Sequence, residues 1–70
     1  MPRYFFDITN GGSQPDSQGE DLADDPDAWR VALRIAREVE HVLQPGTMWE
    51  LKVRRDVPVF RIHIKAEQLI

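Results

Sequence analysis

The chain has 70 residues, no cysteine, and a formal net charge of −3 with both histidines neutral. A length of this order accommodates one domain with one core, and the lack of cysteine excludes disulfides and thiolate metal sites. The sequence shows no apolar run of signal-peptide or membrane-spanning length. Together with the missing cysteines, this predicts a cytoplasmic protein that does not enter a membrane.

Acidic and basic residues are divided unevenly along the chain. Residues 1–29 carry seven acidic residues against one basic residue, whereas residues 30–70 carry five acidic residues against eight basic ones. Such an asymmetry concerns association with partners rather than fold. Because so small a domain buries little surface, we expect its stability to depend on a well-packed core or on self-association.

Residues 3–9 predict a strand, because aromatic and β-branched residues lead into Asn10-Gly11-Gly12, which suits a tight turn. Side chains alternate between the two faces of a strand. This gives two sets: the core candidates Tyr4, Phe6 and Ile8, and, opposite them, Arg3, Phe5 and Asp7.

The segment of residues 13–24 is polar and acidic, with Leu22 as its only large apolar residue. It predicts a loop that contains a short, weak strand around residues 18–22. Its carboxylates do not follow the spacing of a calcium-binding EF-hand, which needs ligands at alternate positions, a central glycine and a final glutamate. We therefore interpret it as a solvated loop without a metal site.

Residues 26–43 predict an amphipathic helix. Asp25-Pro26-Asp27 supplies a capping carboxylate, a proline suited to the first turn and negative charge at the positive end of the helix dipole, and Gln44-Pro45-Gly46 ends the helix. The apolar side chains fall on one arc, with Trp29 and Leu33 at its shoulder. The arc contains Ala28, Val31, Ala32, Ile35, Ala36, Val39, Val42 and Leu43. The polar stripe, which we interpret as solvated rather than phosphate-binding, contains Arg30, Arg34, Arg37 and His41.

Residues 48–54 and 57–65 predict two strands joined as a hairpin through Arg55-Asp56, followed by a C-terminal tail of residues 66–70. Both runs alternate, as expected for strands with one face on a core. The apolar face carries Trp49, Leu51, Val53, Phe60, Ile62 and Ile64. The opposite face carries Glu50, Lys52, Arg54, Val59, Arg61, His63 and Lys65.

These elements predict a single α+β domain over residues 1–70. An antiparallel sheet of three to four strands with one helix across a single face is the simplest assembly that buries every apolar set. The order along the chain is strand, weak strand, helix, strand, strand. The order of the strands within the sheet does not follow from the sequence.

The sequence contains no arrangement typical of an enzyme. Ser13 and Ser17 lack a neighbouring histidine or a nucleophile-elbow motif, and the glycines match no phosphate-binding loop. The acidic residues lie in polar segments where nothing would desolvate them for acid–base catalysis. A domain of this size also has little volume for a substrate pocket. We therefore expect no catalysis, no cofactor, no metal and no small-molecule substrate.

Basic side chains and one aromatic side chain gather on the sheet face away from the predicted helix. These candidate binding residues are Arg3, Phe5, Lys52, Arg54, Arg61, His63 and Lys65. A basic sheet with exposed aromatics is typical of some RNA-binding modules. Here Phe5 is the one aromatic, no ribonucleoprotein motif is present and the net charge is acidic, which favours a protein-binding or solvent-facing surface.

The opening Met-Pro-Arg-Tyr-Phe-Phe-Asp-Ile, the motif Asp16-x-x-Gly19-x-x-Leu22, and the following helix and two strands resemble a family of short bacterial proteins. This family is classed as a domain of unknown function, so the resemblance implies no functional residue. Two departures stand out: Asp7 occupies a position where members often carry histidine, and the turn at residues 10–16 is longer and more polar.

A second, fainter resemblance is to antitoxin domains that form a small sheet with one helix and mask a toxin by protein contacts. Taken together, the sequence predicts a non-enzymatic module for protein–protein interaction or self-association, through a strand edge or the outer sheet face. The alternatives are toxin masking and nucleic-acid binding, the latter through Arg3, Lys52, Arg54, Arg61 and Lys65.

Overall fold

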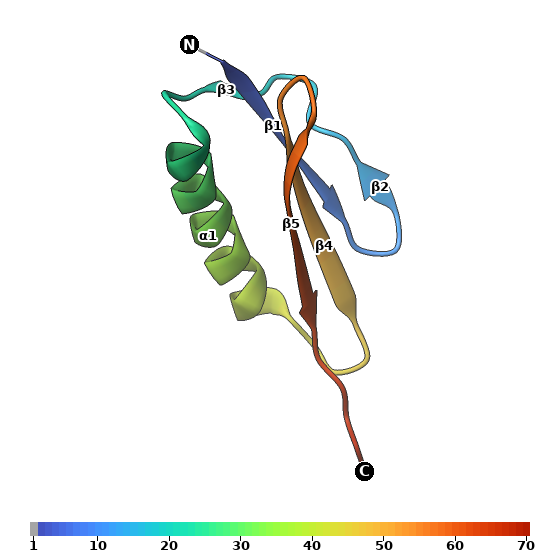
Figure 1. Cartoon of the computed structure of the whole chain (residues 1–70). Coiled ribbons are helices and arrows are strands. Elements are labelled where there is room, and N and C mark those ends of the chain that lie inside the picture. The colour runs from blue at the N-terminus through green and yellow to red at the C-terminus, as the bar shows by residue number, and fades with distance from the viewer. Residues whose placement is uncertain (1) are drawn as a thin grey trace.

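Three long strands, two short ones and one helix form the computed structural model, which describes residues 2–70 (Figure 1). In chain order the elements are β1 (Arg3–Thr9), β2 (Ser13–Gln14), β3 (Glu20–Asp21), α1 (Asp25–Val42), β4 (Met48–Arg54) and β5 (Pro58–Lys65). The predicted α+β class and the helix between two groups of strands are confirmed. The weak strand expected around residues 18–22 is β3, whereas the sequence did not predict β2. Met1, the first residue of the predicted domain, lies outside the described residues.

The sheet is antiparallel throughout and has the order β2-β1-β4-β5, with β3 also beside β1. The first strand pairs with β4 over five residue pairs that include Phe6 with Val53. Both short strands lie along the other side of β1, where β3 pairs with its beginning and β2 with its end. One edge of the sheet is thus made by β2 and β3, and the other by the whole of β5.

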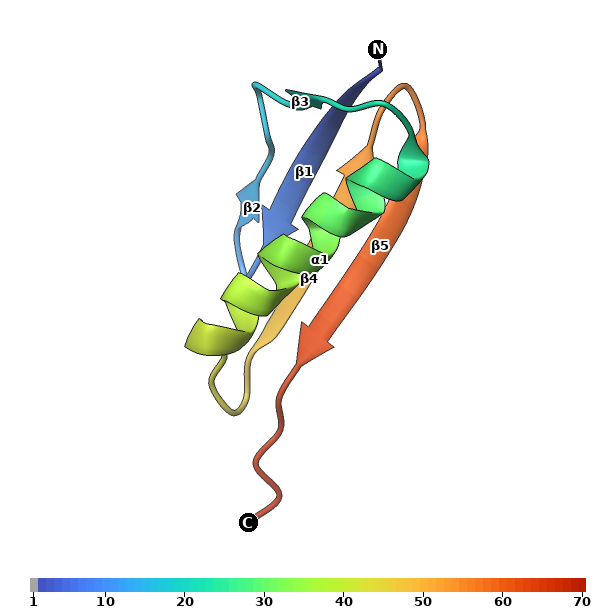
Figure 2. The ribbon, with the colours of Figure 1, turned by 90° about the vertical axis from the view of Figure 1, so that its left-hand side faces the viewer.

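The helix begins one residue before the predicted start, and its N-terminal cap is Asp24 rather than the predicted Asp25. Asp24 precedes α1, and its carboxylate accepts a hydrogen bond of 3.0 Å from the peptide N–H of Asp27. Such caps satisfy donors that the first turn leaves free. The helix crosses one face of the sheet (Figure 2), and its ends lie within one residue of the predicted range 26–43. No helix in the described part of the chain has both the length and the apolar character needed to cross a membrane.

The core lies between α1 and the sheet. It is built from Tyr4 and Phe6 of β1, Leu51 and Val53 of β4, and the alanines that α1 turns toward them. Ala28 and Ala32 are fully buried. Because alanine has the smallest apolar side chain, the helix can approach the strands closely and leave the volume to the aromatic side chains of β1.

The predicted core faces of β1 and β4 agree with this burial, but two other positions differ. Val59, predicted on the opposite face of the sheet, packs half-buried against the core, close to the register shift between Val53 and Arg54. Val42 belongs to the predicted apolar arc, yet it is 60% exposed. It lies in the last turn of α1, where it lines an open hollow with Trp49 and Asn10. Residues 66–70 form the predicted tail beyond β5 (Figure 1), and Ala66 still bonds to the α1–β4 loop.

We expect Leu51→Ala to lower the free energy of unfolding by about 3 kcal/mol, because it removes a buried side chain and leaves a cavity. Leu51 is 4% exposed, whereas Leu33 on α1 is 38% exposed, so Leu33→Ala should cost less than about 1 kcal/mol. Urea denaturation followed by circular dichroism measures both. Equal losses would show that the core does not lie where the structure has it.

Candidate functional site

The outer face, defined as the sheet face away from α1, carries the predicted binding residues. Residues that are direct partners in neighbouring strands share a face. Phe5 pairs with Arg54, Lys52 with Arg61, and Glu50 with His63. By alternation, Arg3 lies on the same face as Phe5, and Lys65 on the same face as Arg61. The structure therefore brings these residues together, but with the acidic residues Asp7 and Glu50 among them.

Near β1, the cations of the outer face contact acidic groups of the same chain. Arg3 is 3.0 Å from the carboxylate of Asp21 and donates a 2.6 Å hydrogen bond to the carbonyl of Gln18. Arg54 donates a 2.7 Å hydrogen bond to the carboxylate of Asp7. The Arg3 contacts hold the segment before α1 against β1, whereas the Arg54–Asp7 pair joins β4 to β1. Both arginines are predicted binding residues, and both are thus occupied.

Phe5 is covered rather than exposed. The guanidinium carbon of Arg54 lies 4.4 Å from the centre of the Phe5 ring, a cation–π contact. Gly19 lies against the same ring, so closely that a Cβ added there would be 2.9 Å from a ring carbon. A base or another flat ligand therefore lacks free access to this ring, which the sequence suggested as an exposed aromatic.

The carboxylate of Asp16 connects the loop to β1. It accepts hydrogen bonds of 3.1, 3.0 and 3.1 Å from the peptide N–H groups of Phe6, Gln18 and Gly19. The N–H of Asp16 itself donates a 2.8 Å bond to Asp7. Burial raises the pKa of Asp16, but the N–H groups of Gly19, Phe6 and Gln18 favour its charged form and outweigh this, so its pKa lies below the ordinary 3.8.

The β4–β5 part of the outer face has a different balance of charge. Glu50 lies 2.8 Å from His63 and 3.8 Å from Arg61, and Lys65 lies 2.6 Å from Glu67. Lys52 has no ion-pair partner among residues 2–70. The side chains of Arg61 and Lys65 are each 58% exposed, so this region retains accessible positive charge.

A polar cluster beneath the first turn of α1 was not predicted from the sequence. The buried Tyr4 donates a 2.5 Å hydrogen bond to Asp25, which also accepts a 3.2 Å bond from Arg55 of the β4–β5 hairpin. The Tyr4 hydroxyl, followed by the Arg55 guanidinium, lowers the pKa of Asp25. The cluster ties strand, helix and hairpin together, which indicates a structural role.

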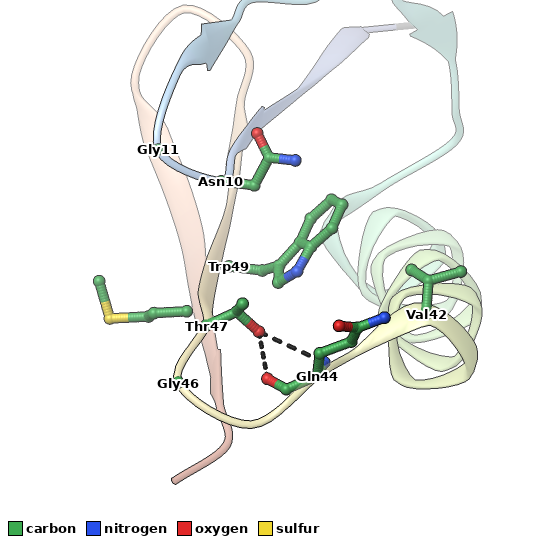
Figure 3. A pocket seen from close by; sticks show the side chains of 8 residues that line it. Asn10, Gly11, Val42, Gln44, Gly46, Thr47 and Trp49 are labelled. Carbon is green, nitrogen blue, oxygen red and sulfur yellow. Dashed lines mark hydrogen bonds between the residues drawn. The ribbon is translucent and has the colours of Figure 1, made fainter.

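Neither the hollow at the end of the molecule nor the distribution of potential metal ligands provides a site of chemistry in the described residues. A hollow of about 410 Å³ lies at the end of the molecule, where Trp49 projects between the turn at Asn10 and Gly11 and the last turn of α1 with Val42 (Figure 3). It contains no charged side chain. Within residues 2–70, no group of three or more histidine or carboxylate side chains is placed to hold a metal ion.

Partly exposed apolar side chains of α1 lie on the face of the sheet that the helix covers, near the free edge of β5. Trp29 and Leu33 are 39% and 38% exposed, and the ring of Trp29 lies 5.1 Å from that of Phe60. An open apolar hollow of about 580 Å³ is lined by Asp25, Pro26, Trp29 and Phe60. These residues are not among the predicted binding residues. The signal that points to them is the position of Trp29 and Leu33 at the shoulder of the apolar arc.

The fold and surface define a two-layer α+β domain in which one helix covers one face of an antiparallel sheet. The chain belongs to the family described as Domain of unknown function (DUF6894), whose model matches residues 3–65. The predicted membership of a domain family of unknown function is thereby confirmed. No match to the chain was found among curated proteins or among solved structures.

The close approach of Gly19 to β1 can be tested by adding a single methyl group. Gly19 has φ of +71°, and a Cβ there would lie 2.8 Å from the carbonyl oxygen of Tyr4. We expect Gly19→Ala to lower the free energy of unfolding by about 3 kcal/mol, through the strained backbone and this contact.

Gly11 provides the matched control, because it also has positive φ but would place a Cβ in open space. Gly11→Ala should lower the free energy of unfolding by about 1 kcal/mol, because it adds only the strain of a non-glycine residue at positive φ. Urea denaturation of both variants at pH 7 measures the difference. Similar losses would contradict the proposed packing of Gly19 against β1.

The lowered pKa values of Asp7 and Asp16 predict a loss of stability in acid. Because the folded-state pKa of each lies below the unfolded one, their contribution is complete above the ordinary value of 3.8 and is lost as pH falls below it. We expect Asp16→Asn to lower the free energy of unfolding by about 1.5 kcal/mol at pH 7. Between pH 7 and pH 3, the free energy of unfolding of this variant should fall by less than that of the natural protein. Urea denaturation at both pH values tests this; parallel losses would contradict it.

Proposed function

We propose that this domain is a non-enzymatic protein-interaction module that binds an extended segment of another protein along β5. The observation that carries the proposal is the free edge of the sheet. Strand β5 has eight residues, pairs with β4 on one side, and has no paired strand on its other side among residues 2–70. Unpaired strand edges are templates for the addition of a further strand.

The backbone groups at this edge can be assigned from the pairing beyond the end of β5. Ala66 donates a 3.1 Å hydrogen bond to Thr47 and accepts a 2.8 Å bond from Gly46, so its peptide groups point toward the β4 side. Backbone groups alternate in direction along an antiparallel strand. The N–H and C=O groups of Arg61, His63 and Lys65 therefore point away from β4, toward the free edge.

The opposite edge of the sheet supports the proposal by contrast. There, β3 pairs with Arg3 and Tyr4, and β2 pairs with Ile8 and Thr9. Between these two pairings, the Asp16 carboxylate accepts a hydrogen bond from the peptide N–H of Phe6. The outward backbone of β1 is thus occupied along its length. No comparable segment of the described chain covers β5.

Apolar surface beside the β5 edge adds a second source of binding free energy. A strand placed there would cover part of Trp29 and the hollow beside Phe60. Aromatic side chains are enriched at protein interfaces because they bury a large area with few rotatable bonds. By comparison, nucleic-acid binding has less support, since Arg3 and Arg54 are paired with carboxylates and Phe5 is covered.

Selection of peptides from a random library, followed by two substitutions at His63, tests strand addition. His63→Pro removes an outward N–H, which an edge strand tolerates because β4 does not use that group. His63→Ala removes the same side chain and keeps the N–H. We expect selected peptides to bind the natural protein and His63→Ala alike, and to bind His63→Pro about tenfold more weakly.

Amide hydrogen exchange provides a readout that does not depend on the folding of His63→Pro. In the natural protein, the amides of Arg61, His63 and Lys65 should exchange rapidly, and a selected peptide should protect all three. Selected peptides that protect none of these amides, or that bind His63→Pro as well as His63→Ala, would overturn the proposal. A library that yields no binding peptide would do the same.

A further inference from the structure

We infer that the segment accepted by β5 alternates acidic and apolar side chains. This inference rests on the proposed function, because it names the chemistry of the partner for the same edge. Successive side chains of an added strand point to opposite faces of the sheet. One set would lie beside the outer-face residues of β5, and the other beside the residues that β5 turns toward α1.

The outer-face row of β5 favours acidic neighbours. This row contains Arg61, His63 and Lys65, and Lys52 lies directly across from Arg61 on β4. Asp7, the partner of Lys52 on β1, is already paired with Arg54. The other carboxylates within reach are Glu50, which His63 and Arg61 share, and Glu67, which contacts Lys65. The three cations Lys52, Arg61 and Lys65 therefore exceed the two carboxylates. Opposite charges on directly paired residues of neighbouring strands stabilise a sheet.

Arg61 is the residue best placed to contact an incoming carboxylate. Its contact with Glu50 is long, at 3.8 Å, while Glu50 is 2.8 Å from His63. The Arg61 side chain is 58% exposed, so it can turn toward a partner without leaving a buried charge unpaired. An arginine also presents several N–H donors in a plane, which suits two hydrogen bonds to one carboxylate.

The row facing α1 favours apolar neighbours. Phe60, Ile62 and Ile64 are half-buried and lie on the same face as the core. Trp29 stands beside Phe60 and is partly exposed at this edge. Asp25, the charged residue that lines the hollow beside Phe60, already accepts hydrogen bonds from Tyr4 and Arg55. A side chain of the added strand on this face would contact mainly apolar atoms, so valine, isoleucine or leucine fits better than a charged residue.

The same charge pattern argues against a second copy as the occupant. In an antiparallel pairing of two β5 strands, the basic row of one copy would face the basic row of the other. Such pairing can set Arg61 of one copy beside Lys65 of its partner, and like charges opposite each other destabilise a sheet. Basic residues on an edge strand are a known protection against self-pairing.

Defined probe peptides test this inference by NMR titration of the labelled natural protein. The first probe alternates glutamate and valine over about nine residues, enough to span the edge. The second replaces every glutamate with lysine, and the third has the composition of the first with all glutamates placed before the valines. We expect the alternating acidic probe to bind at least about tenfold more tightly than either control. Its binding should shift the amides of Arg61, His63 and Lys65.

A charge-reversal variant supplies the complementary test. In Arg61→Glu/Lys65→Glu, both substitutions lie on the outer face at exposed positions, so the fold should be retained. This variant should prefer the lysine probe over the glutamate probe, by a similar factor. Sedimentation equilibrium of the natural protein should show a monomer at the concentrations used.

Two results of the titrations would overturn the inference without affecting the proposed function. Equal affinity for the lysine and glutamate probes would exclude the acidic preference. Equal affinity for the alternating probe and for the third probe, in which all glutamates precede the valines, would exclude the need for alternation. A dimer joined through β5 would identify a second copy as the occupant. If no probe shifts the β5 amides and the peptide library also yields no binder, strand addition itself is excluded.

Discussion

The hydrogen bond from the peptide N–H of Phe6 to the carboxylate of Asp16 is the contact on which the N-terminal half of the sheet depends. The two strands that flank this position have only two residues each, too few to form a stable edge by themselves. By accepting a backbone donor of β1, Asp16 acts as the peptide carbonyl that a continuous strand would supply. The same carboxylate orders the loop through Gln18 and Gly19.

This arrangement explains why the two ends of the basic surface differ. Near β1, Asp16 positions the loop so that Gly19 and Arg54 cover Phe5, while Asp7 and Asp21 neutralise the arginines. The charges there stabilise the folded chain. Along β5 no such loop is formed by residues 2–70, and the exposed basic side chains lie beside a strand edge without a partner in that part of the chain. The feature that distinguishes this surface is therefore its edge, rather than the sum of its positive charge.

Much of the fold could be predicted from local patterns. The alternation of Tyr4 and Phe6, and of Leu51 and Val53, marks the buried face of each strand, because period-two burial is a property of the strand itself. The helix boundaries followed to within one residue from Asp25-Pro26-Asp27 at the start and Gln44-Pro45-Gly46 at the end, although the capping residue itself is Asp24. The sequence also placed the basic residues on one face, because that assignment needs only the register within each strand.

The features that could not be predicted depend on contacts between distant parts of the chain. The pairing of β1 with β4 decides which strand has a free edge, and no local pattern encodes it. The covering of Phe5 by Arg54 and the Tyr4–Asp25 hydrogen bond are contacts of the same kind. Val42 has the correct helical position for burial, but the last turn of α1 faces an open hollow.

The pairing of β1 with β4 also has a consequence for the order of folding. Its ion pair between Asp7 and Arg54 joins residues 47 positions apart, whereas β4 and β5 are joined by a short hairpin. Closing a long loop costs more entropy than closing a short one, so local contacts form first. We expect the β4–β5 hairpin and α1 to assemble early, and β1 to dock late with the Asp16 loop. The edge formed by β2 and β3 would then form last. The free edge of β5 would already be present in the early assembly of α1, β4 and β5.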